Sequence, residues 1–177
     1  DNVVRAWGAR VRQLSNGQLE IKIAMEDGKR TLREHVSFFG GSLSQRSVWD
    51  LAGHMAAGLN YMHAMKVAHC DLTPDNVFVN PSSDAQVKLG DLGNALLLDQ
   101  VDAGARLNRV WTSPEFVAQR IAGSAEAKAA DTYRPAQWRH LLFAHDVFTF
   151  GLVLCFMLTG ALPLEPAEAE ARIAADK

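Results

Sequence analysis

Residues 69–79 read His-Cys-Asp-Leu-Thr-Pro-Asp-Asn-Val-Phe-Val, and residues 87–93 read Val-Lys-Leu-Gly-Asp-Leu-Gly. The Val-Phe-Val end of the first stretch and the Val-Lys-Leu start of the second flank a turn rich in Pro, Ser and Asp. Two short apolar runs around such a turn are typical of a β-hairpin. The rest of the fold can be predicted outward from this hairpin.

Three oxygen-bearing side chains lie at the ends of the predicted hairpin, those of Asp71, Asn76 and Asp91. The hairpin would bring them together, because its two strands run side by side. Hard oxygen donors are the ligands that a magnesium ion carrying phosphates prefers. The stretch therefore predicts a metal and phosphate site, with one carboxylate left free to act as a base.

The two stretches resemble the catalytic and metal-binding loops of eukaryotic-type protein kinases, which read His-Arg-Asp-Leu-Lys-x-x-Asn and Asp-Phe-Gly. The resemblance implies a catalytic loop at 69–76, in which Asp71 accepts the proton of a substrate hydroxyl. Asn76 and Asp91 would hold Mg²⁺ on the phosphates of ATP, so ATP and Mg²⁺ are the expected cofactors and a protein is the expected substrate. Thr73 stands where the family has a lysine that contacts the transferring phosphate.

Length and composition are those of one ordinary globular domain. The chain has 177 residues, of which 48% are hydrophobic and 21% charged, and its formal net charge is −2. Lys and Arg are scattered rather than clustered, which argues against a nucleic-acid partner. The two cysteines, Cys70 and Cys155, argue against a disulfide framework and favour an intracellular compartment, cytoplasmic or nuclear.

Residues 147–164 contain no charged side chain and are long enough for a membrane-spanning helix. A helix that is apolar on every face can equally be buried in a protein core. The start of this segment, Asp146-Val-Phe-Thr-Phe-Gly, resembles the buried central helix of the kinase large lobe, here 146–160. We therefore expect a core helix rather than a membrane span, with Asp146 accepting hydrogen bonds from the backbone of the catalytic loop.

Near the start of the chain, residues 2–8 and 19–25 are predicted to form a second hairpin around the turn at 15–17. Apolar and polar residues alternate in 19–25, as in a strand with one buried face. The resemblance makes residues 1–28 the last strands and hinge of the kinase small lobe, and 29–177 part of a mainly helical large lobe. The expected fold is thus α+β and of the protein-kinase type, but incomplete.

The same resemblance assigns an adenine site. Met25 would lie at the back of the pocket, Glu26 to Gly28 would form a hinge whose backbone hydrogen-bonds adenine, and Phe78 would lie beneath the base. The alternative for residues 1–28 is an ordinary edge hairpin followed by a loop. Phe78 and the non-Arg residue Cys70 also give the chain a weaker similarity to the Wee-type kinases.

A short helix is expected at 31–36 and a longer one after it. Ser47 and Asp50 form a Ser-x-x-Asp pattern that predicts the start of the longer helix. Apolar residues then recur at three- and four-residue steps, which indicates a face packed in the core; these are Val48, Leu51, Ala52, Met55, Leu59 and Met62. His63, at the end of this helix, is expected to be a packed or capping residue rather than a metal ligand.

The resemblance places an activation segment at 91–115, ending in Ser113-Pro-Glu. Residues 94–111 contain no Ser, Thr or Tyr, and Cys70 replaces the arginine that would hold a phosphorylated loop. We therefore expect that loop phosphorylation does not control this protein. Residues 123–140 are predicted to be a surface insertion, helical or disordered.

Three functional interpretations follow from these residues. The first is a fragment of an active protein kinase, with Ser or Thr rather than Tyr as the acceptor. The second is a pseudokinase or scaffold, favoured by Cys70 and Thr73. The third is a small-molecule kinase of the aminoglycoside or choline type, disfavoured by the Pro-Glu pair and the helix start at Asp146. No glycine loop or Val-Ala-x-Lys strand occurs in the sequence, so we expect a fragment of a longer product, or a natural truncation, without useful phosphotransfer activity alone.

Overall fold

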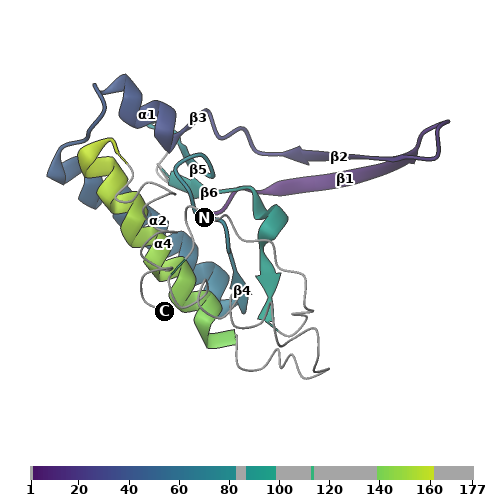
Figure 1. The fold of residues 1–177 in the computed structure, drawn as a ribbon. Coiled ribbons are helices and arrows are strands. Elements are labelled where there is room, and N and C mark those ends of the chain that lie inside the picture. Colours follow the sequence, from purple (N-terminus) through teal and green to yellow (C-terminus); the bar gives the residue numbers. More distant parts are fainter. Residues whose placement is uncertain (1, 83–86, 99–112, 114–138, 162–177) are drawn as a thin grey trace, which may run out of the picture.

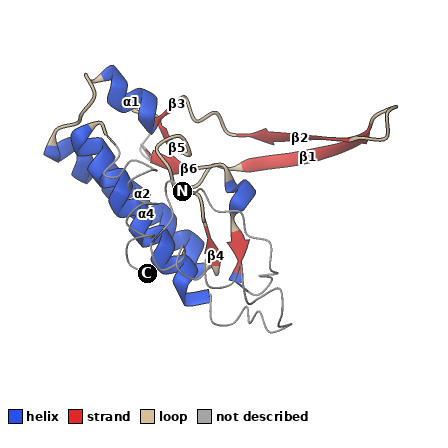
Figure 2. Ribbon diagram, viewed as in Figure 1, coloured by secondary structure: helices blue, strands red, loops and turns tan. Residues whose placement is uncertain are grey.

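The computed structural model describes residues 2–82, 87–98, 113 and 139–161. In these residues helices α2 (Gln45–Ala64) and α4 (Arg139–Thr159) lie side by side (Figure 1). A three-stranded sheet contacts α2, with the strand order β3 (Arg30–Thr31), β5 (Val77–Val79) and β6 (Val87–Leu89). A long hairpin of β1 (Ala6–Gln13) and β2 (Leu19–Met25) extends away from this body. Figure 2 shows that β3, β5 and β6 lie between the helices and the hairpin. The mixed α+β architecture agrees with the fold class expected from the sequence.

The N-terminal hairpin consists of β1 (Ala6–Gln13) and β2 (Leu19–Met25), which pair antiparallel. The first strand predicted at 2–8 is present, but its bounds are wrong: it begins at Ala6 and ends at Gln13, because the residues before β1 pair elsewhere. Val4 N–H donates to Leu89 O at 2.8 Å, and Leu89 N–H donates to Asn2 O at 2.9 Å. The chain start is thus attached to β6 rather than to the hairpin.

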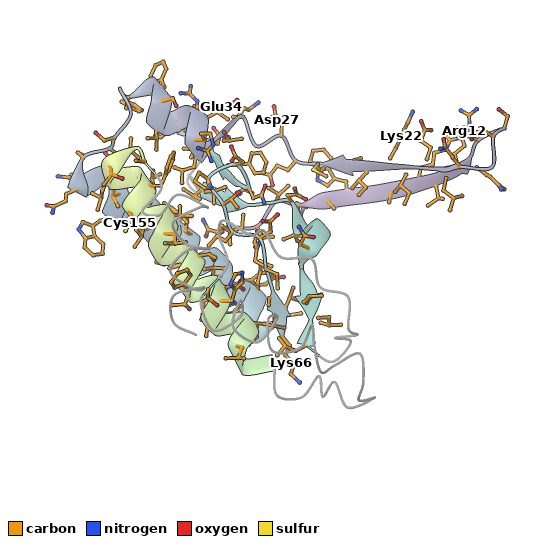
Figure 3. The ribbon with its side chains drawn as sticks, viewed as in Figure 1. Arg12, Lys22, Asp27, Glu34, Lys66 and Cys155 are labelled. Carbon is orange, nitrogen blue, oxygen red and sulfur yellow. The ribbon has the colours of Figure 1, made fainter. Side chains whose placement is uncertain are left out.

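The apolar face of the hairpin is exposed in the described structure. Its exposed fractions run from 51% for Met25 to 68% for Trp7. The alternation predicted for 19–25 is present, but the expected burial of one face is wrong, because a two-stranded hairpin has no second layer of its own. The far end of the hairpin carries the charged side chains of Arg12 and Lys22 (Figure 3). The large exposed apolar side chains of the hairpin are Trp7, Val11, Leu19, Ile21, Ile23 and Met25.

Two helices follow the hairpin. Helix α1 (Leu32–Phe38) begins with a capping box between Thr31 and Glu34, close to the predicted helix at 31–36. Helix α2 (Gln45–Ala64) begins before the predicted start, because Ser44 rather than Ser47 is its N-cap and accepts from Ser47 N–H at 3.2 Å. All six apolar residues predicted to face the core are buried, namely Val48, Leu51, Ala52, Met55, Leu59 and Met62.

The predicted central hairpin is present as β5 (Val77–Val79) and β6 (Val87–Leu89), paired antiparallel with Val77 opposite Leu89. The two-residue strand β3 (Arg30–Thr31) pairs with the other edge of β5. Val77, Val79, Val87 and Leu89 are all buried in one core cluster with residues of α1, α2 and α4. This cluster fixes the hairpin against the helices.

Helix α4 (Arg139–Thr159) contains most of the predicted central helix and begins before it, so residues 139–140 of the expected insertion are helical. The stretch Leu141–Thr159 is long and apolar enough to cross a membrane, and 39% of its most apolar window is buried. Val153, Phe156 and Met157 of this helix belong to the main core cluster. One side of α4 therefore acts as a core helix, as the resemblance to the kinase central helix implies.

The start of the activation segment contains two elements that the sequence did not predict. They are the 3₁₀ turn η1 (Leu92–Asn94) and the short strand β7 (Leu96–Leu97). Strand β7 pairs with β4 (Val67–Ala68), the strand that leads into the catalytic loop. Apart from Ser113, the later part of the expected segment 91–115 and residues 123–138 lie outside the described residues, so the predictions for them stay predictions.

Candidate active site

The loop at 69–76 is fixed by a buried carboxylate from α4. Asp146 is fully buried, and its side chain accepts from the backbone N–H of His69 at 2.8 Å and of Cys70 at 2.9 Å. His63 Nε2 contacts the same carboxylate at 2.8 Å. Cys70 has a φ of 63°, a left-handed conformation in the middle of this loop. The expected role of Asp146 is confirmed by these contacts, and His63 acts as its partner rather than as a metal ligand.

Asp71, the predicted base, lies next to this anchored segment. Its Oδ2 atom accepts a hydrogen bond from Asn94 Nδ2 at 3.0 Å, while its main-chain oxygen accepts from Asn76 Nδ2 at 2.8 Å. Its Oδ1 atom is buried and has no hydrogen-bond partner among the described residues. A buried carboxylate oxygen without a donor is costly. The Asp71 carboxylate therefore keeps part of its capacity to accept a proton or a hydrogen bond unused among the described residues.

The two predicted metal ligands lie at adjacent strand ends. Gly90 N–H donates to Asn76 O at 2.9 Å, so the ladder between β5 and β6 continues for one more pair. Asp91 follows Gly90 directly and has a left-handed backbone with φ 54°. Its carboxylate is exposed, and Oδ1 lies 3.4 Å from Gly93 N. The structure thus joins Asp71 to Asn76 by a direct hydrogen bond and places Asp91 one residue beyond the backbone pair that includes Asn76.

This donor set fits a magnesium ion bound to phosphates. The side-chain nitrogen of Asn76 is engaged by Asp71 O, so its Oδ1 atom is the group left for a cation. Asp91 adds an exposed carboxylate. Among the described residues, no cluster of three or more His, Cys, Asp or Glu side chains could hold a metal. Two protein oxygens nevertheless suffice for Mg²⁺, because it keeps waters and takes its other ligands from the phosphates of the substrate.

The predicted adenine residues Gly28 and Phe78 lie against each other. A Cβ atom on Gly28 would lie 2.4 Å from the Phe78 ring, and one on Gly90 would lie 2.6 Å from it. The half-buried ring is therefore enclosed by two glycine backbones, one from the expected hinge and one from the residue before Asp91. Only glycine allows so close an approach on both sides. The specific similarity to Wee-type kinases stays a prediction.

Met25 and Glu26 are placed differently from Phe78. Met25 ends β2 and is 51% exposed. Glu26 donates its backbone N–H to Arg5 O at 2.9 Å, and its carboxylate pairs with Lys88 Nζ at 2.7 Å. The hydrogen bond from Lys88 holds the pKa of Glu26 below its usual value, with a smaller contribution from the backbone N–H of Arg5. Its side chain therefore faces Lys88, and a cavity of about 520 Å³ is lined by both residues together with Arg5, Trp7 and Tyr61, among others.

The two departures from the catalytic-loop motif, Cys70 and Thr73, are both buried. Thr73 is 4% exposed, and its main-chain oxygen accepts from Asn76 N–H at 3.0 Å. Cys70 is fully buried in a small apolar cluster with Ala68 and Leu142. Burial raises the pKa of the Cys70 thiol. An apolar environment thus surrounds the residue that stands where the family has arginine.

Asn94 is the site residue that sequence reasoning missed. It follows Asp91 closely in sequence, but no spacing rule connects it with Asp71, which lies 23 positions earlier. A polar residue in an otherwise apolar stretch, Ala-Leu-Leu-Leu, was the available signal. The contact appears only once η1 and β7 are folded.

Comparison with known proteins agrees with this geometry. The chain matches the family described as protein kinase domain over residues 1–177. It is 30% identical over 114 residues to the RAF proto-oncogene serine/threonine-protein kinase of Xenopus laevis. It is 28% identical over 127 residues to mitogen-activated protein kinase kinase 9 of Arabidopsis thaliana, and 28% identical over 124 residues to death-associated protein kinase 2 of Mus musculus.

These similarities cover most of the chain but a small part of each relative. They extend over 64%, 71% and 69% of this chain, and over 16%, 36% and 29% of the three relatives. The chain therefore spans about a third or less of the curated relatives it matches. The family match, in contrast, runs from the first residue to the last. This chain belongs to the protein kinase family.

Proposed function

We propose that the chain supplies the catalytic base and the Mg²⁺ ligands of an ATP-dependent protein kinase that phosphorylates serine and threonine side chains. The observation that carries this proposal is the state of Asp71. One of its carboxylate oxygens is held by Asn94, and the other has no hydrogen-bond donor among the described residues, on a loop fixed by Asp146. The choice of Ser and Thr is supported by the similarity to the RAF proto-oncogene serine/threonine-protein kinase of Xenopus laevis.

The proposed reaction uses few groups of the chain. The Asp71 carboxylate accepts the proton of the substrate hydroxyl as the hydroxyl oxygen bonds to the γ-phosphorus and the bond from that phosphorus to ADP breaks. General-base help of this kind contributes about 10²- to 10⁴-fold in rate. Asn76 and Asp91 would hold the metal, which when bound would neutralise charge on the phosphates. Thr73 can offer only a hydroxyl where the family has a lysine cation. Catalysis by this chain therefore depends more on the positioning of the reacting groups than on a positive charge beside the phosphate.

The second candidate is a pseudokinase or scaffold that binds nucleotide without turnover. Two observations favour it. Cys70 lies in an apolar cluster, at the position where an arginine would be needed to bind the phosphate group of a phosphorylated activation loop. The apolar face of the β1–β2 hairpin is also exposed, with Ile21 at 61% and Ile23 at 54%. In this interpretation a partner surface, rather than phosphoryl transfer, is the output of the domain.

The two candidate functions can be distinguished by measuring phosphate transfer by the protein that the longest reading frame containing this chain encodes. Its activity on a degenerate peptide library would be compared with that of Asp71→Asn, and Mg²⁺-dependent ATP binding would be measured on both. We expect binding by both proteins and a loss of transfer of about 10²-fold or more in the variant. ATP binding with equal, negligible transfer by both would establish the scaffold instead.

Two further arms complete this experiment. Peptides that differ only in a Ser, Thr or Tyr acceptor test the proposed substrate class, and preferential labelling of Tyr would contradict it. The 177-residue chain assayed alone should transfer no more phosphate than its Asp71→Asn variant. This is because its sequence contains no glycine loop and no lysine strand to hold the ATP phosphates.

A further inference from the structure

We propose that Asn94 is a positioning residue for the base Asp71, and that it fixes the orientation of the carboxylate that takes the substrate proton. This inference rests on the proposed function and adds a residue to it. Asn94 Nδ2 lies 3.0 Å from Asp71 Oδ2, and both side chains are partly buried. Asp71 Oδ1 is buried and has no partner among the described residues. The two carboxylate oxygens are therefore unequal before any substrate is bound.

The direction of the hydrogen bond follows from its chemistry. An ionised carboxylate can only accept, so the Asn94 amide must present its NH₂ group and not its oxygen. Asn94 is the side chain that donates to the Asp71 carboxylate among the described residues. The donor is neutral, whereas the family lysine replaced here by Thr73 is a cation. Asn94 thus restrains the rotation of the carboxylate without placing a positive charge beside it.

The backbone on both sides of Asn94 is fixed. Before it, the turn η1 starts at the left-handed Asp91 and is closed by a hydrogen bond from Ala95 N–H to Leu92 O at 3.1 Å. After it, β7 pairs with β4, so that Leu96 lies opposite Ala68. Leu98 N–H continues this pairing to Lys66 O at 2.9 Å. Asp71 follows β4 in the sequence and Asn94 precedes β7. Because these two strands pair antiparallel, the base and its donor lie at the same end of one small sheet.

This geometry predicts a specific kinetic defect. Without the amide, the Asp71 carboxylate can turn about its terminal bond and present either oxygen, or neither, to the hydroxyl. Misplacement of a catalytic group by about 1 Å can cost on the order of 10²-fold in rate. ATP binding should change little, because Asn94 contacts the base and not the predicted metal ligands. The defect is expected in kcat rather than in the KM for ATP.

The test uses the longest reading frame that contains this chain, with Mg²⁺, ATP and the best peptide of the library. Asn94→Leu keeps a similar volume but removes the donor, Asn94→Ser keeps a shorter donor, and Asn94→Asp places a second carboxylate beside the first. Leu97→Ala, on the neighbouring strand, is the matched control. We expect Asn94→Leu to lose about 10- to 100-fold in kcat with an unchanged KM for ATP, and Asn94→Ser to recover part of the loss.

The split between kcat and KM, together with the partial rescue by Asn94→Ser, separates positioning from a merely structural role. Asn94→Asp removes the donor and places a second carboxylate beside the first, so it should lose at least as much kcat as Asn94→Leu. Thermal unfolding of all four variants would be measured alongside. Wild-type kcat in Asn94→Leu, with Asp71→Asn inactive, would overturn the role of Asn94 and leave the proposed function standing. A faster Asn94→Leu enzyme would also overturn it, because the contact would then be inhibitory. Absence of any activity above Asp71→Asn would remove both proposals.

Discussion

The backbone N–H of His69 donates a hydrogen bond to Asp146 Oδ2 at 2.8 Å, across a separation of 77 residues. The adjacent N–H of Cys70 reaches the other oxygen of the same carboxylate. A single buried side chain of α4 therefore sets the conformation of the loop that carries Asp71. This relationship connects the stability of the helix to the geometry of the candidate active site.

Replacing Asp146 should be strongly destabilising. Asp146→Asn puts an amide NH₂ against backbone donors that need an acceptor, and removes the charge that pairs with His63. We expect a loss of about 2 to 4 kcal/mol in the free energy of unfolding, measured by denaturant titration. Val147→Ala is the control, since Val147 is 61% exposed on the same helix. The prediction is wrong if Asp146→Asn unfolds within about 0.5 kcal/mol of the control.

The two glycines of α2 should respond to alanine in opposite directions. A Cβ atom on Gly58 would lie 2.6 Å from the backbone oxygen of Asn2, whereas Gly53 has nothing within 4 Å. In an open helical position, Gly→Ala stabilises by roughly 0.5 to 1 kcal/mol. We expect that gain for Gly53→Ala and a loss of about 1 to 3 kcal/mol for Gly58→Ala, because the chain start must move off β6. Equal midpoints for the two variants in the same denaturation experiment would refute the close approach.

The two cysteines should differ in reactivity. Cys70 is fully buried and burial raises the pKa of its thiol, while Cys155 is exposed on α4 (Figure 3). Because the thiolate is the reactive form, iodoacetamide at pH 8 should modify Cys155 and leave Cys70 unmodified in the native protein. Mass spectrometry of tryptic peptides measures both sites. Labelling in denaturant is the control and should reach both cysteines; equal native labelling would show that Cys70 is accessible.

Stability should fall as the pH is lowered from 7 to 5.5. Burial lowers the pKa of His69 and, together with the charge of Arg30, that of His35 below the usual 6.5. The unfolded chain then binds more protons than the native protein near and below pH 6.5, so unfolding becomes easier there. Each histidine contributes at most about 1.4 kcal/mol per pH unit.

His35→Phe isolates one of these contributions. The variant keeps an aromatic ring against Phe39, whose centroid lies 5.0 Å from that of His35, but it cannot titrate. The dependence of the unfolding free energy on pH between 7 and 5.5 should become shallower in this variant. An identical slope in the variant and the original protein would show that His35 takes up no proton on unfolding.

Predictions from the sequence succeeded where the signal was local. The hairpin of β5 and β6 and the apolar face of α2 follow from periodicity over a few residues, and both are present. Boundaries failed where a distant partner intervened. The strand predicted at 2–8 is displaced because Asn2 and Val4 pair with Leu89. The expected burial of one face of 19–25 also failed, because alternation indicates which side chains share a face and not what covers it.

The sequence by itself determined the kinase motifs, with Asp71, Asn76 and Asp91 at spacings that a hairpin can bring together, and the apolar central helix. Only the tertiary structure decided that Asp146 and His63 anchor the catalytic loop, that Gly28 and Gly90 enclose Phe78, and that Asn94 holds one oxygen of the base. The physical reason is the distance along the sequence over which each kind of interaction acts. Periodicity and turn chemistry act over a few residues, whereas a hydrogen bond between positions 71 and 94, or 69 and 146, depends on where the packed strands and helices bring the chain back together.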